Sequence, residues 1–134
     1  MPKMPRWKSP KNLAEALADG DGIWEDERWA PLLVTAMSGT EYQGRAIPVA
    51  WQLEFDPSED EFAAASARIE EDGGEPDGYG WGEYIRRAVQ TAEPALAARL
   101  HLTDCESAAC VIWVETEADC RALVETTWKL AFAT

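Results

Sequence analysis

The chain has 134 residues, of which 46% are hydrophobic, and it contains seven Trp, three Tyr and three Phe. This length and composition predict one domain with its own core and exclude a wholly disordered chain. Acidic residues outnumber basic ones by 25 to 12, so the net charge is −13 and direct binding to nucleic acid or to an anionic membrane is not expected.

The three cysteines are an odd number, which does not indicate a disulfide framework. The basic first residues are not followed by the apolar run of a secretory signal, and no apolar segment approaches the length of a membrane span. We therefore expect a cytoplasmic protein with reduced thiols.

Residues 1–9 contain prolines and lysines without hydrophobic periodicity, which predicts a flexible basic arm. Residues 10–134 are then expected to form a single domain. Ser9 and Pro10 suit the cap and the first position of a helix, which Gly20 would end.

Two neighbouring segments predict an antiparallel hairpin. Residues 29–37 form an apolar run, and residues 46–55 alternate large apolar side chains with smaller or polar ones. This alternation would put every large side chain of the second strand on one face, and residues 41–44 suit the turn between the strands. Because Pro48 has no N–H for the ladder, the strand is expected to be at an edge or bulged there.

The middle of the chain predicts two helices. Asp56-Pro57 would begin the first, and Gly73-Gly74 would end it before a mobile acidic loop. The glycines in residues 78–82 predict a flexible segment. Trp81 then opens the second helix, whose apolar residues recur at spacings of three and four until Pro94 ends it.

Residues 100–103 and 108–115 predict a second hairpin around the turn 104–107. The strand 108–115 is apolar on both faces, which indicates a central strand or one covered by a partner, and leaves a homodimer open. Thr116 begins a capping box for the last helix. Together these elements predict an α+β domain with a mainly antiparallel sheet of about four strands and helices packed on one side.

No group of residues has the spacing of a known catalytic or metal site. The acidic turn Asp19-Gly20-Asp21-Gly22 begins like a calcium loop, but Ile23 occupies a ligand position, so a solvated turn is the better interpretation. The single His101 and the cysteines follow no paired-ligand pattern, and His101 is expected to be in the core or half-buried. We expect no catalytic residue, cofactor or metal, since an enzyme would need a pocket that gathers His101 with several carboxylates.

Five short motifs stand at the starts or ends of the predicted elements. They are Trp29-x-Pro31, Gly78-Tyr79, Trp81 at the start of a helix, Pro94-x-Leu96, and Asp104-x-Glu106 before a strand. In this order they resemble the bacterial immunity protein 51 family, over about residues 28–132. Members are thought to be encoded beside polymorphic toxins and to protect the producing cell. The resemblance implies a protein that binds one cognate toxin domain and occludes it stoichiometrically, without catalytic residues of its own.

A toxin that acts on nucleic acid has a basic active face, which would attract this acidic chain. The candidate toxin-binding residues are two acidic sets and one aromatic residue outside the apolar stripe: Glu59, Asp60, Glu61, Glu70, Glu71, Asp72, Glu75, Asp77 and Tyr79. Trp81 begins the stripe and is expected in the core. The same charges also fit a solvated helix end and loop. The alternative function is an acidic adaptor or DNA-mimic-like regulatory module that binds a basic protein.

Overall fold

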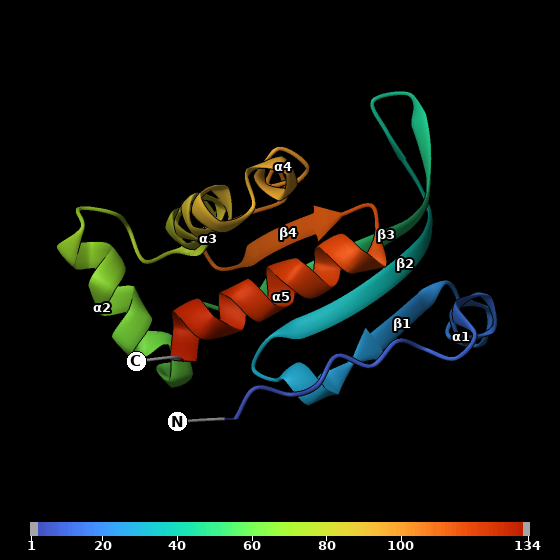
Figure 1. Cartoon of the computed structure of the whole chain (residues 1–134), viewed down its shortest axis with the longest axis horizontal. Coiled ribbons are helices and arrows are strands. Elements are labelled where there is room, and N and C mark those ends of the chain that lie inside the picture. Colours follow the sequence, from blue (N-terminus) through green and yellow to red (C-terminus); the bar gives the residue numbers. More distant parts are fainter. Residues whose placement is uncertain (1–2, 133–134) are drawn as a thin grey trace.

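The computed structural model describes residues 3–132 and has an α+β fold (Figure 1). A four-stranded antiparallel sheet has the order β1-β2-β3-β4, so neighbours in the sheet are also neighbours in the chain. The strands are β1 (Ile23–Asp26), β2 (Leu33–Tyr42), β3 (Arg45–Phe55) and β4 (Cys110–Val114). The predicted fold class, with about four antiparallel strands, is confirmed.

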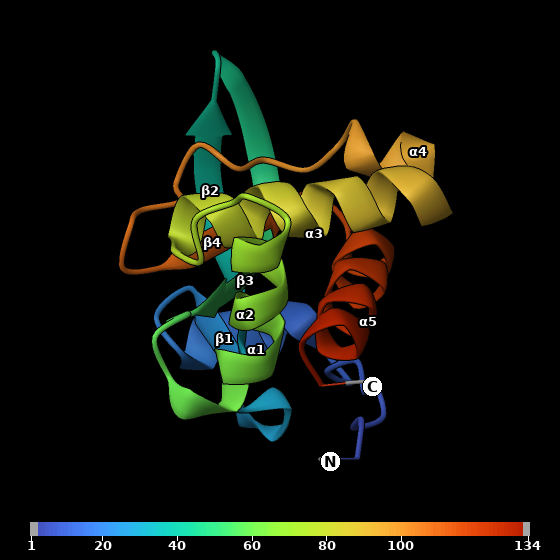
Figure 2. The same cartoon turned by 90° about the vertical axis from the view of Figure 1, so that its left-hand side faces the viewer.

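The helices contribute to one apolar core. They are α1 (Leu13–Asp19), α2 (Ala63–Glu71), α3 (Gly78–Ala92), α4 (Pro94–Ala97) and α5 (Glu117–Phe132), with short 3-10 turns η1 (Glu27–Trp29) and η2 (Asp60–Phe62). The buried hydrophobic residues of all five helices belong to the same cluster, with α5 lying along the sheet and the β2–β3 hairpin extending beyond it (Figures 1 and 2). Within residues 3–132, no helix combines the length and apolarity needed to cross a membrane.

The opposite face of the sheet has a smaller apolar cluster, which contains no helical residue. Ile47, Ala50 and Trp113 form it, and Tyr42 packs at its edge. Ile47 was expected on the same face as the large residues that follow it in β3, and that prediction was wrong for this residue. The pairing of β3 with β2 is interrupted between Val49 and Ile47, and beyond this interruption Ile47 packs with Ala50 and Trp113.

Pro48 lies where β3 is locally an edge strand, as predicted. The pairing of β4 with β3 extends only over Trp51–Phe55, so at Pro48 the neighbour in the sheet is β2 alone. On the β2 side the register also skips Gly39, whose φ of +70° is rare for residues with a Cβ. The missing proline N–H is therefore accommodated at an irregular point of the hairpin.

One expected strand was wrong, and one observed strand was not predicted. Residues 100–103 contribute only an isolated bridge between His101 and Trp113, and the sheet gains β1 instead. Strand β1 is short and half acidic, so its sequence has no alternating apolar pattern. It is held by β2, and by Trp24 stacking edge-on against Trp51 at a centroid distance of 6.1 Å.

Strand β4 is at the edge of the sheet and not in its centre. Its second face is covered by its own chain, because the His101 ring stacks on Trp113 at 3.8 Å and Tyr42 contacts Trp113 at 5.2 Å between ring centroids. The two-sided apolar pattern of this strand thus has an intramolecular explanation.

The beginnings of two helices differ from expectation. Helix α1 starts after Asn12, whose side chain accepts the Glu15 N–H at 3.1 Å, and not after Ser9. Helix α2 starts only at Ala63, since the Asp56 carboxylate accepts the Ser58 N–H at 2.9 Å in a turn and residues 60–62 then form the 3-10 turn η2.

Trp7 lies against the domain. Its ring packs on Trp29 and Trp51 at centroid distances of 6.1 and 6.4 Å, and its Nε1 donates to a Glu117 carboxylate oxygen at 2.9 Å. The prediction of a flexible arm for residues 1–9 did not foresee these contacts. Their partners are distant in sequence, so local composition could not indicate them.

The glycines before Trp81 belong to α3 and serve close packing. Gly78 N donates to the Ser107 carbonyl at 3.0 Å, and a Cβ on Gly78 would lie 1.8 Å from the Glu106 carbonyl oxygen. Asp77 caps the helix by accepting the Gly80 N–H at 2.8 Å. This segment is therefore the first turn of the helix, fitted against the turn before β4, and not a lead-in to it.

The close approach at Gly78 predicts the sign of the change in stability when this glycine is replaced by alanine. Gly78→Ala should lower the free energy of unfolding by about 3 kcal/mol, although alanine for glycine inside an exposed helix usually raises it by about 1 kcal/mol. Gly44→Ala is the control, since its Cβ would meet no atom within 4 Å and only its φ of +76° would cost about 1 kcal/mol. Urea unfolding measures the stability of both variants. Equal decreases in the free energy of unfolding would contradict the packing argument.

Candidate protein-interaction site

Helix α2 is fixed on its inner side and presents its outer side to solvent. Ala65 and Ile69 are buried, and the Ser66 hydroxyl accepts the Trp81 Nε1–H at 3.1 Å. Arg68 Nη2 donates to the Leu130 carbonyl at 2.6 Å, which joins α2 to the last helix. The end of α2 is also defined, since Gly74 N donates to the Ile69 carbonyl at 2.9 Å.

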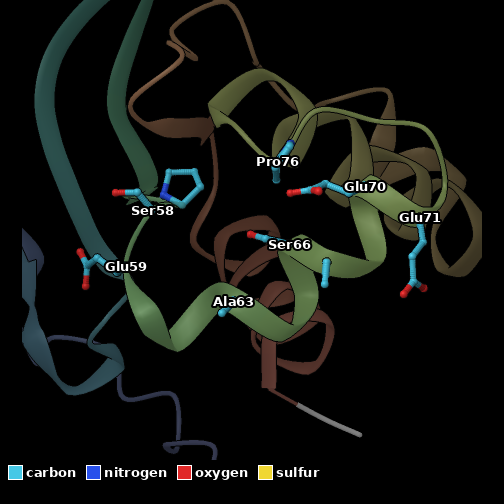
Figure 3. Close-up of a pocket in the computed structure, with 9 residues that line it drawn as sticks. Ser58, Glu59, Ala63, Ser66, Glu70, Glu71 and Pro76 are labelled. Carbon is cyan, nitrogen blue, oxygen red and sulfur yellow. The ribbon is translucent and has the colours of Figure 1, made fainter.

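The outer side of α2 borders an open hollow of about 680 Å³, here called the α2 groove. It is lined by Pro57, Ser58, Glu59, Ala63, Ser66, Ala67, Glu70, Glu71 and Pro76. Figure 3 shows Glu59 at one end, with the Glu70 carboxylate extending toward Pro76 at the other while Glu71 points outward. The groove thus has small side chains along the helix and carboxylates at both ends.

The region around the groove is strongly and openly acidic. Residues 54–77 contain ten acidic residues and one basic residue, Arg68, so they account for −9 of the net charge of −13. Among the residues that the structure describes, no ion pair involves a carboxylate of this segment, whereas seven ion pairs occur elsewhere. The charge of this surface is therefore not neutralised within the fold.

The carboxylates at one end of the groove repel one another. The pKa of Glu59 is raised by partial burial, by its contact with Glu61, and by the nearby charge of Asp56. Carboxylates crowded in this way bind a proton more readily, and an approaching cation would relieve the same repulsion.

The predicted residues are only partly brought together. Three of them, Glu59, Glu70 and Glu71, line the groove, while the exposed Asp60, Glu61, Asp72 and Glu75 lie in η2 or in the loop after α2. Asp77 is half-buried as the cap of α3, which gives it a structural role. Tyr79 is 60% exposed on the first turn of α3, and Trp81 is fully buried as expected.

Sequence reasoning missed the small residues of the groove. Ala63 and Ala67 are exposed on α2 and make room between the two acidic ends. The only sequence signal was the run of alanines in 63–67, which helix propensity alone can explain.

A second hollow of about 560 Å³, here called the sheet hollow, lies on the face of the sheet that carries the small cluster. Its lining includes Met37, Tyr42 and Trp113, together with the carboxylates Asp21 and Glu41. Sequence reasoning did not bring the lining residues together, because they come from all four strands and from two turns. Like the α2 groove, the sheet hollow is lined by no basic residue among those described.

His101 is bonded to a single carboxylate near the sheet hollow. Its Nε2 lies 3.0 Å from a Glu115 oxygen, and Arg45 donates to both Glu115 oxygens at 2.5 and 2.9 Å. The Arg45 and His101 hydrogen bonds lower the pKa of Glu115 to about 2. Neither hollow is lined by His101, and in the described chain no three His, Cys, Asp or Glu side chains form a metal-binding group.

The Glu115 interactions predict a pH dependence of stability. Because the pKa of Glu115 falls from its ordinary 4.5 to about 2 on folding, the interactions stabilise the fold above pH 4.5 and are lost as the pH falls toward 2. Glu115→Gln should therefore lower the urea midpoint at pH 7 and reduce its decrease between pH 4.5 and 2. Glu106→Gln, which changes an exposed carboxylate outside this network, should leave that decrease intact.

Comparison of the chain with protein-family models, with curated proteins and with solved structures found no match. The resemblance to the immunity protein 51 family therefore stays a prediction from the motifs in the sequence. The geometry shows an acidic surface around the α2 groove whose carboxylates form no ion pair among the described residues.

Proposed function

We propose that this chain is an immunity protein that acts in the cytoplasm and neutralises a cognate bacterial toxin domain by stoichiometric binding. The observation that carries the proposal is the unneutralised acidic surface of residues 54–77 around the α2 groove. A toxin that acts on nucleic acid fits this surface best, because its active face must attract phosphates and is therefore basic.

The groove is suited to cationic side chains. Lys and Arg have apolar stems that pack on small residues such as Ala63 and Ala67, while their charged ends reach carboxylates at the groove ends. The toxin would keep its basic residues engaged here and unable to contact nucleic acid. Such occlusion needs affinity and fast encounter, and no catalytic group on this chain.

Electrostatic attraction acts mainly on the rate of association. A concentrated field of one sign raises the encounter rate with an oppositely charged partner by 10-fold to 1,000-fold at low salt, by order of magnitude. This suits an inhibitor that must capture its toxin before the toxin reaches a substrate.

Co-expression is the direct test of the function. The toxin domain encoded beside this chain should kill the host when induced alone, and co-expression should restore growth and give a complex that co-purifies. Failure of both, with an active toxin and a folded protein, would reject this pairing. Capture of a basic host protein without toxin rescue would instead support the adaptor or DNA-mimic alternative.

Charge reversal tests the surface. The double variant Glu70→Lys/Glu71→Lys should slow association with the toxin about tenfold at low salt and weaken its salt dependence, because it inverts the field at one end of the groove. The helix should tolerate it, since cations are favourable at a helix C-terminus. Stopped-flow measurements over a range of salt concentrations give both quantities.

The matched control makes the same charge change at the opposite end of the molecule. Glu15→Lys/Asp19→Lys alters two exposed carboxylates on α1, far from α2 (Figure 1). This control should change the rate of association with the toxin much less than the α2 double variant does. Equal effects of the two double variants would show that only net charge matters and would remove the α2 groove from the interface.

A further inference from the structure

A two-residue turn separates two of the three cysteines, with Cys105 on one side and Cys110, the first residue of β4, on the other. Glu106 N donates to the Ala109 carbonyl at 2.9 Å and Ala109 N donates back to the Glu106 carbonyl at 3.2 Å, which makes these residues a hydrogen-bonded antiparallel pair. Cys105 and Cys110 flank this pair, and antiparallel pairing continued by one residue would make them a non-hydrogen-bonded pair. In that arrangement the Cα atoms are about 4.5 Å apart.

This arrangement suits a disulfide. A disulfide requires Cα atoms about 4.4 to 6.8 Å apart and side chains on the same face, and a directly opposed pair meets both requirements. Both side chains are buried in the same apolar core, and the Cys105 Sγ–H donates at 3.2 Å to the carbonyl of Val111, the residue after Cys110. The third cysteine, Cys120, lies on α5 and is fully buried.

The thiols differ in reactivity. The neighbouring Cys110 side chain and the hydrogen bond to the Val111 carbonyl lower the pKa of Cys105 to about 7, so a large fraction is thiolate near neutral pH. The neighbouring Cys105 side chain and burial raise the pKa of Cys110. Burial also raises the pKa of Cys120 strongly, and the nearby carboxylates of Glu117 and Asp119 add to this effect. Cys105 is 7% exposed, whereas Cys110 and Cys120 have no exposed area.

We propose that Cys105 and Cys110 form a reversible thiol–disulfide site that a hydroperoxide oxidises. The Cys105 thiolate attacks one peroxide oxygen and breaks the O–O bond, which gives a sulfenic acid and, after protonation, one water. The Cys110 sulfur then attacks the Cys105 sulfur, an S–S bond forms, and the hydroxide that leaves takes up the Cys110 proton as a second water. Two thiols lose two electrons in total to one peroxide, and a dithiol reductant reverses the reaction.

The position of the pair gives the bond a structural consequence. The same turn receives the start of α3, because Gly78 N donates to Ser107 and its Cα packs against the carbonyls of Glu106 and Ala109. A disulfide across the base of the turn would prevent the turn from opening. It would thereby fix the support for the first turn of α3, which follows the acidic loop.

The test uses the purified full chain in its reduced form and hydrogen peroxide as the probe. Denaturing thiol titration should show the three free cysteines fall to one, and intact mass should show the loss of two hydrogen atoms per chain. Peptide mapping should link Cys105 to Cys110 within one chain, and dithiothreitol should restore all three thiols.

Single variants separate this pair from general cysteine oxidation. Cys120→Ala should still form the crosslink, whereas Cys110→Ser should form none and should accumulate higher oxidation states at Cys105. Circular dichroism confirms that each variant is folded before treatment. The proposal is overturned if the folded wild-type chain keeps three thiols, links Cys120, or oxidises Cys105 to a sulfinic acid without a crosslink.

Discussion

The arrangement of the acidic surface depends on the fully buried indole of Trp81. Its ring lies edge-on to Phe55 of β3 at 5.2 Å and to Phe62 of η2 at 5.7 Å, while its N–H is bonded to Ser66 of α2. One side chain thus links the sheet, the 3-10 turn, α2 and its own helix α3. Because the indole N–H has a partner, its burial adds apolar contact without an unsatisfied polar group.

This aromatic centre explains how the fold tolerates its acidic surface. Burial of one large apolar side chain contributes about 1.5–3 kcal/mol, and Phe55, Phe62 and Trp81 are all buried. Exposed charge pairs interact by about 0–1 kcal/mol, and salt screens them further. Repulsion from Glu61 and Asp56, which adds to burial in raising the pKa of Glu59, is therefore small beside the packing beneath it. The fold does not need internal cations to hold these carboxylates in place.

Sequence periodicity predicted the helices and strands that bury a continuous stripe of apolar side chains. Helix α3, the main part of β3 and α5 were expected because their apolar residues recur at regular spacing, and the same pattern separated the buried Trp81 from the exposed Tyr79. Strand β1 and the docking of Trp7 depend on partners far along the chain. Periodicity carries no information about such partners, so they could not be predicted.

The sequence predicted the negative charge of the candidate site but not the shape of the α2 groove. The acidic composition of residues 54–77 is visible in the sequence, but the lining of the α2 groove combines the Asp56 turn with α2, which begins only after η2. Ala63 and Ala67 are exposed on the outer side of α2, between Glu59 and the carboxylates at the end of the helix. Long-range attraction would therefore bring many basic proteins to this surface. The small side chains of the α2 groove would select among these basic proteins. Only a partner whose cationic side chains match the shape of the groove can also displace water from it.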